Sequence, residues 1–80
     1  MRTLDARTLA LRLSVGQRHR LIRAGEQLDG SVLVSGKGQI QIHLRAAGLT
    51  VAHDERYDVC TPMGIAVRAI CLDDPFLART

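Results

Sequence analysis

His43, His53 and Cys60 are the residues of this 80-residue chain that we consider as candidates for catalysis. His43 and His53 lie in stretches that alternate between apolar and polar residues, and Cys60 follows His53 by seven positions. A thiol nucleophile needs a nearby base, which His53 could supply across a turn, and Asp54 or Glu55 could orient that histidine. A catalytic histidine also needs a substrate in reach. We therefore favour a structural interpretation: one exposed histidine, one partly buried histidine and a structural thiol.

Arginines are the candidates for binding an anion. Residues 1–45 carry eight Arg and Lys against three acidic residues, a net charge of +5, whereas residues 46–80 carry −2. The residues that could bind an anion are Arg12, Arg18, Arg20 and Arg45, with Arg23 beside them on a basic face. That face could contact the phosphates of a nucleic acid, but the chain has almost no aromatic residues for stacking on bases. It could equally pair with acidic residues of a second copy, which is the interpretation we favour.

The sequence contains no pattern typical of a metal site or of a membrane-spanning segment. The two cysteines, Cys60 and Cys71, do not form a CxxC pair, so we expect no metal, no cofactor and two buried, reduced thiols. The N-terminus lacks the apolar region of a signal peptide, and no apolar run approaches the roughly 20 residues of a membrane helix. These features predict a cytoplasmic protein. Ten of the 11 basic residues are Arg, which suggests a GC-rich bacterial or phage genome.

Short β-branched and apolar runs separated by turn residues organise the chain. The expected strands are Thr8–Val15, Arg18–Arg23, Ser31–Ser35, Gln39–Arg45, Leu49–His53, Tyr57–Cys60 and Ile65–Leu72. They predict a single all-β domain over residues 1–80, a small barrel or sandwich of six to seven antiparallel strands. Residues 1–7 are expected to be frayed, and residues 73–80 to form a C-terminal tail. A helix over residues 4–13 (LDARTLALRL) is the alternative for the first run.

The order of turns and strands in residues 9–72 resembles the cupin fold. The resemblance lies in the glycine-marked hairpin at residues 34–42, the stretch Leu49–Val59, the Pro62-Met63-Gly64 turn and the closing run Ile65–Leu72. The pattern at Leu13–Leu21 (LSVGQRHRL) is similar to the opening of an uncharacterised proteobacterial family of short cupin-like domains. The cupin-type pyrimidine/purine nucleoside phosphorylases are similar in length. Arg45, Val67 and Cys71 stand where metal-binding cupins carry ligands, so the resemblance implies no metal.

Three functions remain open at this point. The first is a non-enzymatic domain for protein interaction or self-association, because a small aliphatic core gains burial by pairing with a second copy, here expected as a homodimer. The second is an enzyme resembling the small cupin phosphorylases, with Arg20 or Arg45 for phosphate and His43 or His53 as a base. The third is a nucleic-acid-binding regulator that uses the arginine face.

Overall fold

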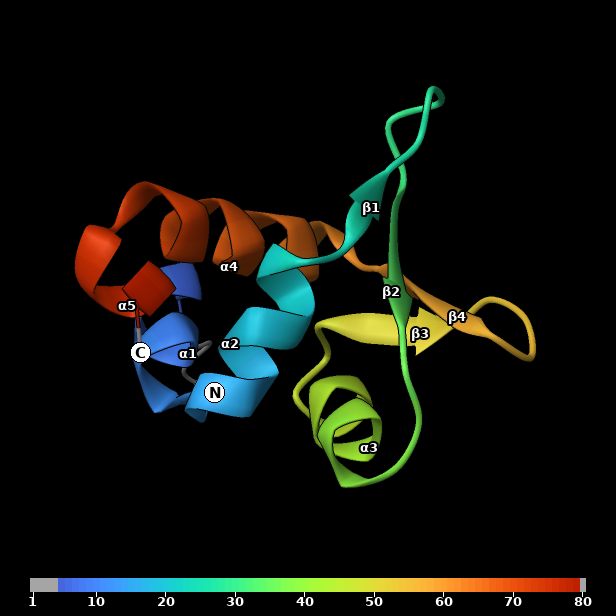
Figure 1. Cartoon of the computed structure of the whole chain (residues 1–80), viewed down its shortest axis with the longest axis horizontal. Helices are drawn as coiled ribbons and strands as arrows, with labels where there is room; N and C mark the ends of the chain where they lie inside the picture. The colour runs from blue at the N-terminus through green and yellow to red at the C-terminus, as the bar shows by residue number, and fades with distance from the viewer. Residues whose placement is uncertain (1–4, 80) are drawn as a thin grey trace.

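The computed structural model describes residues 5–79, which alternate between helices and short strands (Figure 1). In chain order the elements are α1 (Ala6–Arg12), α2 (Val15–Ile22), β1 (Gly25–Glu26), β2 (Val32–Ser35), α3 (Gln39–Ala46), β3 (Thr50–Ala52), β4 (Tyr57–Cys60), α4 (Pro62–Asp73) and α5 (Pro75–Arg79). Helices α1, α2, α4 and α5 gather in one half of the molecule, whereas the sheet and α3 form the other half. The protein is therefore a mixed α/β domain.

The all-β prediction is wrong, and so is the barrel or sandwich that it implied. Three runs expected to be strands are helical: Thr8–Val15 contains α1, Gln39–Arg45 is α3, and Ile65–Leu72 lies within α4. Arg18–Arg23 likewise belongs mostly to α2. The described strands form one open four-stranded antiparallel sheet with two free edges. The helical alternative for residues 4–13 is confirmed by α1.

Side-chain caps explain where three of these helices begin. The Asp5 carboxylate accepts a hydrogen bond from the backbone N–H of Thr8 at 2.8 Å. Ser14 and Gln17 form a capping box at the start of α2, each side chain bonding the other residue's backbone N–H. Thr61 caps α4, and Pro62 occupies its first turn, where the missing N–H costs no hydrogen bond. These signals outweigh the period-2 alternation of the same runs.

Helix α3 shows why alternation was misleading in QIQIHLR. Ile40, Ile42 and Leu44 were expected to share one buried face, but in a helix Ile42 turns away from the other two. Leu44 is fully buried, whereas Ile42 is 54% exposed. Gln41 lies buried instead, and its amide donates to the Val34 carbonyl at 3.2 Å. The helix therefore buries a polar residue that the strand prediction placed outside.

The sheet has the strand order β1-β2-β4-β3, and its inner face is covered by helices. Val34 and Asp58 are paired in register and both point into the interior. The alternate residues Leu33, Val59 and Val51 are also register partners, and they form an apolar row on the opposite face. The predicted strands at Ser31–Ser35, Leu49–His53 and Tyr57–Cys60 are confirmed, together with the turn of residues 54–56 between the last two.

A small aliphatic core holds the two halves together. Its fully buried side chains include Leu21, Val34, Leu44, Leu49 and Val67. Both cysteines are buried and free, as expected. Helix α4 approaches the chain so closely that a Cβ atom on Gly64 would lie 1.9 Å from the backbone oxygen of Leu49. Only glycine allows this contact, which fixes the N-terminal end of α4 against the start of β3.

The chain ends differ from what the sequence predicted. Residues 1–4 of the expected frayed segment lie outside the described residues, and Asp5 to Arg7 cap and begin α1. The expected tail at residues 73–80 contains the end of α4 and the short helix α5. Leu77 of α5 is buried in the core, so this segment packs on the domain.

Candidate functional site

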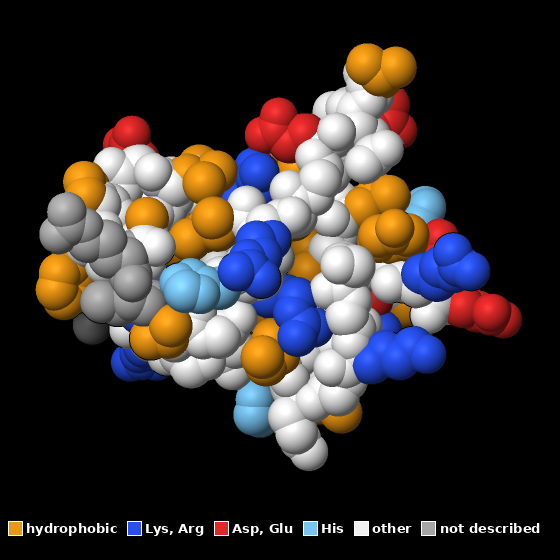
Figure 2. Space-filling model, viewed as in Figure 1, with side chains coloured by type: hydrophobic (Ala, Val, Ile, Leu, Met, Phe, Trp, Pro, Cys, Tyr) orange, Lys and Arg blue, Asp and Glu red, His pale blue; other side chains and the backbone are white. Residues whose placement is uncertain are grey.

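Two hollows lie side by side where α2, the β2–α3 loop and the β3–β4 turn meet. The first, about 320 Å³, is lined by Gly16, His19, Arg20, Arg23 and Ser35. The second, about 290 Å³, is lined by residues of the loop 36–38, of α3 and of the turn 54–58. They adjoin at Ser35 and Gly36, which are consecutive in the chain. Figure 2 shows Lys and Arg side chains running across this face of the molecule.

Five cationic side chains line these hollows. Arg45 is paired with Asp58, and we call the other four the cationic strip: Arg20, Arg23, Lys37 and Arg56. None of the four takes part in the ion pairs formed among residues 5–79. Arg23, Lys37 and Arg56 are exposed, and Arg20 is half-buried. They come from three segments that are distant in sequence. The fold therefore concentrates positive charge that its own carboxylates do not neutralise.

The position of Arg20 is set by its neighbours. A Cβ atom on Gly36 would lie 1.7 Å from a terminal nitrogen of Arg20, so the guanidinium rests directly on the glycine backbone. The same nitrogen lies 3.4 Å from the side-chain oxygen of Gln41, a residue of α3. Gln41 is in turn anchored to β2 through Val34. Arg20 is thus held at the junction of α2, α3 and β2, with its outer edge in the first hollow.

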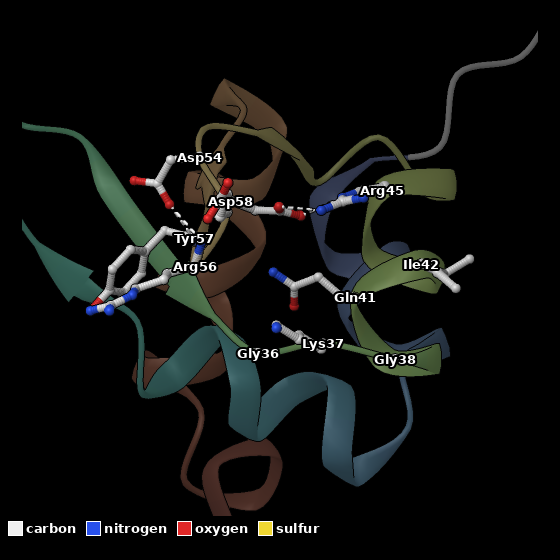
Figure 3. Close-up of a pocket in the computed structure, with 11 residues that line it drawn as sticks. Gly36, Lys37, Gly38, Gln41, Ile42, Arg45, Asp54, Arg56, Tyr57 and Asp58 are labelled. Carbon is white, nitrogen blue, oxygen red and sulfur yellow. Dashed lines mark hydrogen bonds and ion pairs between the residues drawn. The ribbon is translucent and has the colours of Figure 1, made fainter.

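The carboxylates of the second hollow are mostly engaged in structure. Arg45 binds Asp58 through Nε at 2.7 Å and a terminal nitrogen at 2.6 Å, and Thr50 adds a hydrogen bond at 3.2 Å. Asp58 is buried, and its hydrogen bonds with Arg45 hold the pKa of its carboxyl below the ordinary value. Figure 3 shows Arg45 pointing to Asp58. This pair neutralises itself and leaves no charge for a ligand.

The β3–β4 turn is shaped by Asp54. Its carboxylate accepts the backbone N–H groups of Arg56 at 2.7 Å and of Tyr57 at 2.8 Å, and these bonds lower the pKa of Asp54. Glu55 stands exposed at the tip with no ion-pair partner among the described residues. The turn thus presents the Arg56 side chain to solvent, with one acidic neighbour that partly offsets it.

Of the four arginines predicted to bind an anion, Arg20 lines the first hollow and Arg45 lines the second. Arg18 is buried and donates to the Leu13 carbonyl at 2.6 Å. Arg45 is held by Asp58, and Arg12 is exposed at the end of α1. Arg12 and Arg18 lie on α1 and α2 rather than on the expected strands.

The three catalytic candidates do not form a common site among the described residues. The His43 ring lies on α3, with its Nδ1 3.2 Å from the Gln17 amide nitrogen. His53 lies exposed at the start of the β3–β4 turn. Cys60 is buried at the end of β4, and burial raises the pKa of its thiol. A raised thiol pKa disfavours the nucleophilic thiolate.

Lys37 and Arg56 are the residues of the strip that sequence reasoning missed as site residues. Lys37 was assigned only to a hairpin turn, and Arg56 only to a charged turn. A signal was present, because both lie in glycine-rich or charged loops, where binding residues concentrate. Their proximity depends on the β2–β4 pairing and on α3 being a helix, which the sequence pattern did not reveal.

The chain has no significant match among known protein families, curated proteins or solved structures. Residues 5–79 contain no cluster of three or more His, Cys, Asp or Glu that could hold a metal ion. None of the described helices has the length and apolar character needed to span a membrane. The cationic strip is therefore the feature of the described residues that indicates a function.

Proposed function

We propose that this protein binds the phosphate backbone of duplex nucleic acid through the cationic strip. The observation that carries the proposal is the set of four cations, Arg20, Arg23, Lys37 and Arg56, that form no ion pair within residues 5–79 and line two adjoining hollows. Phosphate contacts from Arg and Lys release counterions, which supplies most of the affinity of non-specific nucleic-acid binding. The predicted cytoplasmic location belongs to this proposal, because nucleic acid is accessible there.

A duplex is a better ligand than a single strand for this surface. Proteins that bind single strands combine positive charge with aromatic side chains on which bases stack. The strip has one aromatic neighbour, Tyr57, which is only 39% exposed, and Phe76 lies on α5 in the other half of the domain. A regular duplex instead presents phosphates at fixed spacing, which a row of cations can follow without stacking.

The backbone at the start of α3 supports the same ligand. Gly38 precedes α3, and no side chain caps this helix. The first N–H groups of α3 therefore remain beside Lys37 and add partial positive charge to the second hollow. Phosphate oxygens accept hydrogen bonds from such groups.

The test compares two double variants that remove the same charge. Arg23→Gln with Lys37→Gln changes the strip, and Arg7→Gln with Arg12→Gln changes α1; both lower the net charge from +3 to +1. Binding to a fluorescent duplex of about 20 base pairs is measured by anisotropy at low salt. The strip variant should lose about tenfold or more in affinity, because two phosphate contacts disappear. The α1 variant should stay within about twofold.

Equal losses in the two variants would show that only net charge matters, and the strip would then not be the binding surface. A single strand of the same length is measured in parallel. The duplex should bind more tightly than the strand. A preference for the single strand would contradict the proposed ligand.

The outer face of α4 favours a second role, self-association. We define this face by its exposed apolar residues: Pro62, Ile65, Ala66, Ala69 and Leu72. Ile65 and Leu72 are 40% and 46% exposed, and Arg68 of the same helix reaches back to α2 instead. A helix that is apolar on all sides is normally buried. A second copy could cover it in an antiparallel pair, which places Asp73 beside the positive N-terminal end of the partner's α4.

Sedimentation equilibrium tests this second role. The wild type should form a concentration-dependent dimer, and Leu72→Lys should shift it to monomer, because the charge would be buried at the contact. Leu28→Lys is the matched control, since Leu28 is fully exposed on the β1–β2 loop. A wild type that stays monomeric at high concentration would contradict self-association and leave the nucleic-acid proposal intact.

A further inference from the structure

We propose that the outer face of α3 enters the major groove of duplex DNA and recognises A·T base pairs, with Ile42 contacting the thymine methyl group. This inference rests on the proposed function, since it assigns a specificity to the same surface. The outer face consists of Gln39, Ile42, His43 and Ala46, which are all exposed and lie at helical spacing.

The outer face of α3 is uncharged. Exposed helix faces are ordinarily rich in charged residues, but here an apolar and two polar side chains point to solvent. Figure 3 shows Ile42 pointing away from the sheet, and its side chain helps to line the second hollow. With 54% of its surface exposed, Ile42 contributes little to the core. A single exposed apolar residue is common on protein surfaces, so Ile42 alone does not indicate a binding site. The residues around Ile42 supply the further evidence.

Positive charge borders this face, and α3 itself contains no acidic residue. Lys37 lies two residues before α3, and Lys37 and Arg56 line the second hollow together with Ile42. A helix that enters a groove needs cations at its margins to contact the phosphates on the groove walls. The charge distribution around α3 therefore complements DNA, with an uncharged centre for base edges.

The dimensions are compatible with the major groove. An α-helix with its side chains is about 10–12 Å across. The major groove of B-form DNA is about 12 Å wide and admits one helix. In double-stranded RNA this groove is deep and narrow and excludes side chains. We therefore assign the outer face of α3 to DNA.

The residue types on the outer face of α3 predict which base pair this helix recognises. The amide of Gln39 can bond both N6 and N7 of adenine, and an aliphatic side chain contacts the C5-methyl group of thymine. Ile42 lies three residues after Gln39, so the two side chains are neighbours on the helix surface. His43 is positioned by its contact with Gln17 at 3.2 Å. Gln39 and Ile42 thus recognise the two partners of one A·T pair or of neighbouring pairs.

Replacing thymine by uracil tests this inference directly. The two duplexes have identical sequences rich in A·T pairs, and they differ only in the C5-methyl groups. Wild-type protein should bind the uracil duplex about three- to fourfold more weakly, which corresponds to one buried methyl group. Ile42→Ala should bind both duplexes equally, with an affinity close to that of wild type for the uracil duplex.

Val51→Ala is the matched control, because Val51 is 51% exposed and lies on β3 away from α3. This variant should keep the full difference between the two duplexes. Equal wild-type affinities for thymine and uracil duplexes would overturn the inference, as would a methyl effect that persists in Ile42→Ala. In either case salt-dependent duplex binding would remain, and the proposed function would stand. Absence of binding to any duplex would overturn both.

Discussion

The arginines of this domain fall into two sets that differ in what they contact. Arg45 makes two hydrogen bonds to the buried carboxylate of Asp58, and Arg68 makes three, to two backbone carbonyls and to the exposed carboxylate of Glu26. Arg23 and Arg56 carry the same charge but direct it at solvent, without an ion pair among residues 5–79. Identical side chains thus serve stability in one region and remain available to a ligand in the other.

Sequence position alone does not distinguish the arginines that stabilise the fold from those that face solvent. Arg45 and Arg56 lie within the same 20-residue stretch. The two arginines differ in their tertiary contacts. Asp58 of β4 points inward and accepts a hydrogen bond from Arg45 of α3, whereas Arg56 projects from the β3–β4 turn. A substitution should therefore affect either stability or binding, depending on the set.

The largest effect is expected at Arg68. Its Nε donates to the Leu21 carbonyl at 2.9 Å and a terminal nitrogen to the Ala24 carbonyl at 3.2 Å, so it satisfies the C-terminal end of α2. Arg68→Met keeps the aliphatic packing and removes these donors. We expect a loss of about 3 kcal/mol in the free energy of unfolding, from the range for hydrogen bonds to charged groups. Urea denaturation measures it.

Duplex affinity of folded Arg68→Met should be unchanged, because Arg68 lies outside the cationic strip. A variant as stable as the wild type would show that the guanidinium does not hold α2 to α4. A variant that is as stable as the wild type but binds the duplex weakly would show that Arg68 contacts the nucleic acid rather than stabilising the fold.

Asp58→Asn should have the next largest effect on stability, a loss of about 2 kcal/mol, because the charge-assisted bonds to Arg45 and Thr50 are weakened. Arg45 holds the pKa of Asp58 below its ordinary value of 3.8. The stabilisation is therefore fully present above that value and is lost as pH falls toward the lower pKa of the folded state. Urea midpoints measured from pH 6 to pH 3 should fall in the wild type and fall less steeply in Asp58→Asn.

Parallel pH profiles in the two proteins would contradict the role assigned to Asp58. Asp54 is a useful control, since its pKa is lowered mainly by the backbone N–H groups of Arg56 and Tyr57. Asp54→Asn should affect the conformation of the turn, and hence the placement of Arg56, more than the stability of the domain.

The smallest effects are expected at two adjacent residues of the β3–β4 turn, and they should have opposite signs. Arg56→Gln should weaken duplex binding about threefold at low salt, and Glu55→Gln should strengthen it about twofold, because one removes an attraction and the other a repulsion. Both residues are exposed, so the free energy of unfolding should change by no more than about 0.5 kcal/mol. Anisotropy titrations measure both. Changes of the same sign would exclude contact between this turn and the phosphates.

The sequence predicted the sheet half of the domain better than the helical half. Val32–Ser35, Thr50–Ala52 and Tyr57–Cys60 were found because β-branched residues and turn chemistry agree there with the tertiary structure. The alternating run Gln39–Arg45 and the nearly continuous apolar run Ile65–Leu72 were also predicted as strands, but the helix period fits both runs once Ile42 and Ile65 are exposed. Such exposure cannot be read from the pattern of an isolated run.

Two helix signals were available and were given too little weight. Ser14 and Gln17 have the spacing of a capping box, and Thr61-Pro62 has the cap and first-turn proline of a helix start. For the site, Arg20 was predicted, whereas Lys37 and Arg56 were not. The register of β2 with β4 brings Ser35 opposite Tyr57, and hence the two loops together, which no local pattern specifies.

The salt dependence of duplex binding tests the central claim most directly. Four cations on phosphates predict that log Kobs falls with log salt with a slope of about −3 to −4 for wild-type protein. The slope should fall to about half that value in Arg23→Gln with Lys37→Gln, and it should stay at the wild-type value in Arg7→Gln with Arg12→Gln. A wild-type slope near zero, or a slope that the strip variant leaves unchanged, would contradict binding of duplex nucleic acid by the cationic strip.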